Sequence, residues 1–164
     1  MRTATRFMIL AVLLTALPAA AQMHWNQVGS TGILDETSVP HQFTQMTLEH
    51  AATATGTIVA RYPVTNVWGS SNSFMPPWST LEMAHIDNSP SAVVSARLVE
   101  VDRCTNIETT VCSVSSVDGP TATTCRRCSW VPPLDFGNNV YYVEVRVSRS
   151  VTNVTASLQH LNIQ

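Results

Sequence analysis

The clearest alternation of hydrophobic and polar positions runs from Asn139 to Arg149. The hydrophobic parity holds Tyr141, Val143, Val145 and Val147. The other parity holds Tyr142, Glu144, Arg146 and Ser148. A period of two with β-branched and aromatic residues on one side is typical of an antiparallel strand that is half buried and has its polar face in water. We therefore predict a strand here, with Val143 and Val145 in a core and Glu144 exposed to solvent.

The same period of two recurs in shorter stretches that are separated by residues favouring turns. These stretches cover residues 41–49, 56–64, 81–86, 92–103, 111–116, 121–125 and 154–163. The parity changes between Leu98 and Val99 and again near Leu161, which predicts a bulge or a kink at each point. About eight short strands without a convincing amphipathic helix predict an all-β fold. We expect a single antiparallel β-sandwich of jelly-roll or immunoglobulin-like type, stapled by disulfides.

The first residues have the pattern of a signal peptide. Arg2 and Arg6 precede an apolar run over residues 7–17, and small residues follow at 19–21. The run is too short to span a bilayer stably, so we expect cleavage before Gln22. Residues 22–164 would then form one domain, with residues 22–40 as an extended N-terminal arm. The mature protein would be secreted or periplasmic, and the cell exterior is favoured.

Charge is sparse along the chain and shows no run of one sign. The sequence has nine Arg, no Lys, eleven acidic residues and a formal net charge of −2. Nucleic-acid binding normally requires a basic patch or stripe, which is missing here. Residues 22–164 also contain no apolar run of membrane length. We therefore expect neither a nucleic-acid partner nor membrane insertion.

The four cysteines lie close together in the sequence, at Cys104, Cys112, Cys125 and Cys128. An exported chain meets an oxidising compartment, so disulfides are expected. If Asp118-Gly119 is the centre of a hairpin turn, Cys112 lies opposite Cys125, which leaves Cys104 for Cys128. A bond between Cys104 and Cys112 is the alternative pairing. A zinc site is disfavoured, although Cys125 and Cys128 have zinc-knuckle spacing, because the first two cysteines lie far apart and export favours oxidation.

No motif for catalysis or for binding a cofactor or metal stands out. The candidate bases are five scattered histidines, His24, His41, His50, His85 and His160. None of them lies in a triad or metal-ligand motif. We therefore expect no catalytic residues, no cofactor and no metal, with an unrecognised hydrolase as the alternative.

Aromatic residues and amides gather in one loop over residues 66–79, which is rich in Gly, Ser and Pro. They are Trp68, Phe74, Trp78, Asn66 and Asn72. Exposed aromatic rings with neighbouring amides suit a carbohydrate-binding module, because flat rings pack on the C–H groups of sugars. In the alternative, the tryptophans fold back and cap the sandwich, since large apolar rings are normally buried.

Low charge, many Ser and Thr side chains and expected disulfides also suit a non-enzymatic structural or interaction protein of the cell exterior. The arm could pair with an edge strand of a neighbouring subunit and build a homo-oligomer or fibre. Alternatively, the arm pairs with its own domain.

The order of elements and the turn from Gly137 into the strand with Tyr141 and Tyr142 resemble small uncharacterised exported all-β proteins of bacteria. This resemblance implies no activity. We expect a structural protein that binds itself, with binding of a surface polysaccharide as the alternative.

Overall fold

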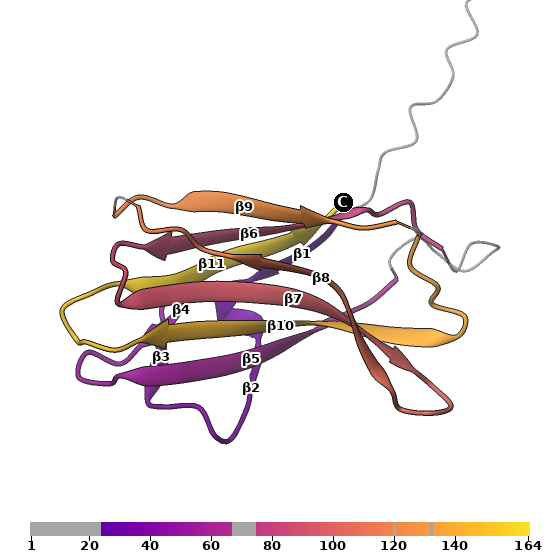
Figure 1. Ribbon diagram of the computed structural model, residues 1–164. Helices are drawn as coiled ribbons and strands as arrows, with labels where there is room; N and C mark the ends of the chain where they lie inside the picture. Colours follow the sequence, from indigo (N-terminus) through magenta and orange to yellow (C-terminus); the bar gives the residue numbers. More distant parts are fainter. Residues whose placement is uncertain (1–23, 67–74, 120, 132) are drawn as a thin grey trace, which may run out of the picture.

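The computed structural model describes residues 24–66, 75–119, 121–131 and 133–164, and within these it contains two antiparallel sheets (Figure 1). In order across the sheet, sheet A consists of β3 (His41–Phe43), β4 (Leu48–His50), β11 (Ala156–Ile163), β6 (Thr80–Asp87) and β9 (Thr124–Ser129), with β1 (Trp25–Val28) also paired to β11. Sheet B consists of β2 (Ile33–Leu34), β5 (Gly56–Val64), β10 (Asn139–Arg149), β7 (Ala92–Asp102) and β8 (Glu108–Ser115). A short 3-10 helix, Gly29–Thr31, joins β1 to β2. No helix in the described residues is long and apolar enough to cross a membrane.

The two sheets pack face to face around one hydrophobic core. β10 is central in sheet B, between β5 and β7, and its Val143, Val145 and Val147 are fully buried. Leu158 of β11 and Met83 of β6 belong to the same buried cluster from the side of sheet A. The predicted antiparallel β-sandwich and the buried face of residues 139–149 are thus confirmed.

Both parity changes in the sequence coincide with irregular strand pairing. The register between β7 and β8 shifts between Leu98 and Val99, which confirms the bulge expected there. The register between β11 and β6 shifts between Leu158 and His160, just before Leu161. The shift returns Leu161 to the buried side without taking β11 out of its sheet.

The arm pairs with its own domain in its described part. β1 pairs with β11, where Trp25 lies opposite Ile163, and β2 pairs with β5. The Tyr62 hydroxyl donates a 2.6 Å hydrogen bond to the carbonyl oxygen of Gly29. A Cβ atom at Gly32 would lie 2.5 Å from the Tyr62 ring, so this close approach requires glycine. The intrachain alternative therefore describes the arm in this structure, while residues 1–21 lie outside the described part.

One disulfide joins the two sheets, and its pairing differs from the expected one. Cys112 in β8 is bonded to Cys128 in β9, with 5.9 Å between their Cα atoms. Cys104 and Cys125 are exposed free cysteines. The expected pairs Cys112 with Cys125 and Cys104 with Cys128 are therefore wrong, as is the alternative of Cys104 with Cys112. No group of three or more His, Cys, Asp or Glu within the described ranges is placed to hold a metal ion.

The error in the pairing follows from the segment between β8 and β9. These strands belong to different sheets, so the chain after Ser115 crosses between sheets and forms no two-residue hairpin. Asp87 holds the crossing, because its carboxylate accepts a hydrogen bond from the Ser116 hydroxyl and its carbonyl oxygen accepts one from the Gly119 amide. Counting outward from Asp118-Gly119 therefore assigned Cys112 the wrong partner.

Candidate binding surface

The outward face of sheet B carries three rows of side chains that run across the strands. Their positions follow from the register of β10 with β5 and β7 and of β7 with β8. The charged row is Arg61, Glu144, Arg97 and Ser113. The serine row is Val59, Arg146, Ser95 and Ser115. The tyrosine row is Pro63, Tyr142, Val99 and Thr110. Because strand side chains alternate between faces, these residues point away from the core that Val143 and Val145 enter.

Glu144, the centre of the charged row, is buried although its strand position faces outward. Its side chain is only 2% exposed. Its Oε1 atom accepts hydrogen bonds from Nε of Arg97 at 3.1 Å and from Nε of Arg146 at 3.0 Å. A terminal nitrogen of Arg61 lies 3.5 Å from Oε2. The expectation of a solvent-exposed Glu144 is therefore wrong, because the long arginine side chains fold over the shorter carboxylate.

The carboxyl groups in and beside the charged row are ionised at neutral pH. Burial alone would raise the pKa of the Glu144 carboxyl, but hydrogen bonds from Arg97 and Arg146 outweigh it and lower this pKa. At the end of the row, hydrogen bonds from Thr37 and from Arg61 lower the pKa of Asp35 to about 2. Arg61 also forms a 3.0 Å ion pair with Asp35. Glu144 in the row and Asp35 beside it are thus each paired with a guanidinium group.

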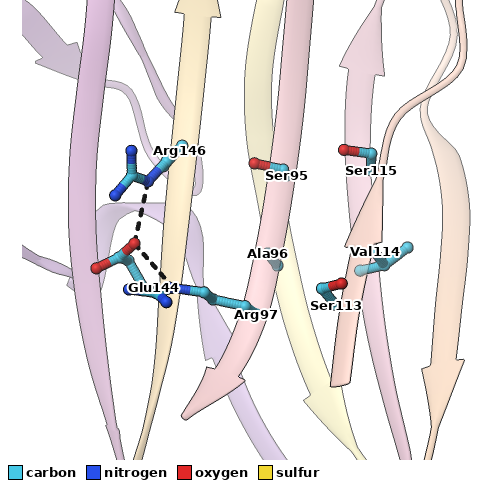
Figure 2. Close-up of a pocket in the computed structure, with 8 residues that line it drawn as sticks. All are labelled: Ser95, Ala96, Arg97, Ser113, Val114, Ser115, Glu144 and Arg146. Atoms are coloured by element: carbon cyan, nitrogen blue, oxygen red, sulfur yellow. Dashed lines mark hydrogen bonds and ion pairs between the residues drawn. The ribbon is translucent and has the colours of Figure 1, made fainter. Parts of the chain in front are cut away.

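A hollow of about 340 Å³ lies over the charged and serine rows, between β10, β7 and β8 (Figure 2). Figure 2 shows Arg97 and Arg146 converging on Glu144, with Ser95 beside them on β7 and Ser113 on β8. The side chains of Arg97 and Arg146 are 37% and 56% exposed. The hollow therefore presents guanidinium and hydroxyl groups to solvent above a buried carboxylate.

The tyrosine row adds apolar surface beside the charged row. Tyr142 is half buried and lies between Pro63 on β5 and Val99 on β7. Burial and a hydrogen bond with Glu108 raise the pKa of its hydroxyl. Val99 is fully buried, so the half-buried Tyr142 ring and the exposed Pro63 supply the apolar surface that borders the hydrogen-bonding groups on this face.

The loop over residues 66–79, which was predicted as a ligand site, is described only in part. Trp68, Phe74 and Asn72 lie outside the described residues. Trp78 is 1% exposed and packs edge-on against Phe136 with 6.2 Å between ring centroids, so it belongs to the core as the capping alternative expected. Asn66, just after β5, is partly buried. The structure therefore brings neither Trp78 nor Asn66 into the three rows.

Sequence reasoning missed the surface that the structure assembles, although one signal for it was present. Tyr142, Glu144 and Arg146 were recognised as the outward parity of one strand. Their partners Arg61 and Arg97 come from strands far away in the sequence. Only the strand register brings these residues together.

Comparison with known proteins identifies the fold. No protein-family model matches the sequence, and no curated protein sequence matches it either. The CBM36-1 domain of a multidomain xylanase from the hindgut metagenome of Trinervitermes trinervoides has a TM-score of 0.50 and 8% identity, over 87% of this chain and 97% of that domain. The xylan-binding module CBM86 from Roseburia intestinalis has a TM-score of 0.50 and 9% identity, over 87% of this chain and 95% of that module. At these identities the likeness shows that the chain shares the β-sandwich fold of such modules.

Proposed function

We propose that the protein is a non-catalytic carbohydrate-binding module that binds a polysaccharide along the outward face of sheet B. The observation that carries the proposal is the tyrosine row lying directly beside the charged and serine rows. A sugar ring has apolar C–H faces that pack on aromatic rings, and hydroxyl groups that pair with guanidinium, hydroxyl and carboxylate groups. Adjacent apolar and hydrogen-bonding rows offer both kinds of contact to one chain of sugars.

The fold supports this proposal over the structural alternative. The similar module from Roseburia intestinalis is described as a low-affinity xylan-binding module, and this chain covers 95% of its length. The segment available for strand exchange is occupied, because β1 and β2 pair within the chain. Carbohydrate binding is therefore a better explanation of this molecule than self-assembly by strand addition.

The proposed location agrees with the proposed ligand. We take residues 1–21 as a signal peptide and place the mature domain outside the cell, where polysaccharides are accessible. The Cys112–Cys128 disulfide suits an oxidising compartment. Non-catalytic binding would serve attachment of the protein, or of a partner joined to it, to a glycan surface.

Binding of purified protein to soluble polysaccharides tests the function. We expect measurable affinity for at least one of xylan, mixed-linkage glucan, galactan and polygalacturonate by isothermal titration calorimetry. Tyr142→Ala should weaken that affinity by about 10-fold or more, because a central aromatic contact commonly contributes that much to binding. Phe43→Ala, which removes an exposed ring from β3 in sheet A, is the matched control and should bind as the wild type does.

Thermal melting of both variants must accompany the titrations, because Tyr142 is half buried. A loss of binding in Tyr142→Ala that is folded at the assay temperature supports the site. Unchanged binding in that variant would exclude the outward face of sheet B, and absence of binding to every polysaccharide would exclude the function.

A further inference from the structure

We infer that the ligand of this surface is an acidic glycan whose hexuronic acid units place their carboxylates on Arg97 and Arg146. The inference rests on the proposed function and specifies the class of polysaccharide that the surface takes. It starts from the hydrogen-bonding capacity that these two arginines retain.

Arg97 and Arg146 each use one donor to hold Glu144. A guanidinium group has five N–H donors, and in both residues only the Nε donor is bonded to Oε1 of Glu144. The terminal nitrogens of both have no hydrogen-bond partner in the described part of the chain. A terminal N–H pair matches the two oxygens of a carboxylate and binds it bidentately. The shared Glu144 anchor holds both groups at the hollow, so little conformational entropy is lost when a carboxylate binds.

The exposed charge of the hollow is positive, although the chain as a whole has a formal net charge of −2. Of the guanidinium groups around Glu144, those of Arg97 and Arg146 line the hollow and are 37% and 56% exposed, while the carboxylate is 2% exposed. Arg61 contacts Glu144 and pairs with Asp35, and the exposed Glu108, which does not line the hollow, places a negative charge near Arg97. An incoming anion in the hollow would therefore meet two partly exposed guanidinium groups, while the carboxylate beneath them is buried.

The serine hydroxyls indicate that the anion belongs to a sugar. Ser95, Ser113 and Ser115 line the same hollow, and their hydroxyl groups have no hydrogen-bond partner among the described residues. Each hydroxyl can donate one hydrogen bond and accept others, which suits the hydroxyl groups of a pyranose ring. A carboxylate on the arginines and ring hydroxyls on the serines together describe a hexuronic acid.

Paired polysaccharides that differ only in charge provide the test. Polygalacturonate and its fully methyl-esterified form share one backbone, and only the first carries carboxylates. We expect the wild-type protein to bind polygalacturonate at least about 10-fold more tightly than the ester, because hydrogen bonds between charged groups are the strong ones. This preference should shrink as salt is raised, since the site is open to solvent.

Variants of the arginines test which residues cause the preference for polygalacturonate over its methyl ester. Arg97→Gln and Arg146→Gln should each abolish most of the preference for polygalacturonate over its ester. Arg126→Gln, which removes the same charge from an exposed position on β9 of sheet A, should leave it intact. Arg97→Lys keeps the charge over Glu144 but loses the bidentate fork, so it should retain the fold and only part of the preference.

The outcomes separate the two proposals. Equal binding of polygalacturonate, its ester and neutral xylan would overturn the acidic-glycan inference and leave carbohydrate binding in place. If the protein bound none of these three and no other polysaccharide, both proposals would be overturned. Dextran sulfate that binds as tightly as polygalacturonate would overturn the assignment to a carboxylate. If the preference for polygalacturonate persisted in both Arg97→Gln and Arg146→Gln, the glycan carboxylates would bind at a site other than these two arginines.

Discussion

At the scale of single residues, Glu144 shows that strand parity determines direction but not exposure. Its alternation with Val143 and Val145 correctly predicted that it points away from the core. Its burial arises from Arg97 on β7, Arg61 on β5 and Arg146 on its own strand. A short carboxylate between three long side chains loses its solvent, and its ionisation then depends on those neighbours.

We predict that Glu144→Gln lowers the free energy of unfolding by about 1–2 kcal/mol at pH 7. The figure is modest because the arginines remain partly exposed and solvent screens their charges. The folded-state pKa of Glu144 is lower than its ordinary value of 4.5, so its contribution is complete above that value. The contribution is lost as the pH falls through the folded-state pKa.

The measurement is urea unfolding of both proteins from pH 7 down to pH 3. The difference between wild type and Glu144→Gln should shrink as the pH falls below about 5. A difference that is constant with pH would contradict the assigned role of the carboxylate charge.

At the scale of elements, the strands were predicted more accurately than their partners. Turn residues around Asp118-Gly119 correctly separated β8 from β9. They did not reveal that the two strands belong to different sheets, because a local turn signal contains no information about which edge a strand joins. The disulfide of Cys112 with Cys128 therefore connects β8, at one edge of sheet B, with β9, at the corresponding edge of sheet A.

We predict that Cys112→Ala and Cys128→Ala destabilise the protein by a similar amount, about 3 kcal/mol. The expected size follows from the entropy of closing a loop of that length in the unfolded chain, where the sequence separation is 16. Cys104→Ala and Cys125→Ala should have little effect, since both residues are exposed and free. Denaturant unfolding measures the four variants, and peptide mapping identifies the bond. A large effect at Cys125 would contradict the pairing.

At the scale of the whole molecule, the two open sides of the sandwich are closed by different means. The disulfide closes the side of β8 and β9. On the opposite side, the arm contributes β1 to sheet A and β2 to sheet B, so it connects the two sheets. Trp25 of this arm is 2% exposed, which makes it part of the core. The arm is therefore an integral part of the fold.

We predict that deleting residues 22–38 unfolds the domain, whereas a chain beginning at Gln22 folds normally. The deletion removes buried Trp25, and truncating a core aromatic alone costs about 3–5 kcal/mol of a typical total of about 5–15 kcal/mol. Circular dichroism and size-exclusion chromatography compare the two proteins. A folded monomer from the deletion, together with assembly of the longer chain, would instead support strand exchange between subunits.

The sequence by itself determined the all-β class, the buried face of residues 139–149 and the parity changes near Leu98 and Leu161. These features are local, since a period of two and a break in it can be recognised within one strand. Only the tertiary structure decided which strands pair, which cysteines bond and which outward residues meet. Arg61, Arg97 and Glu144 became one row because β5 and β7 flank β10 in a specific register. Register is set by the burial of a whole sheet face against another sheet, and no single stretch of sequence contains that information.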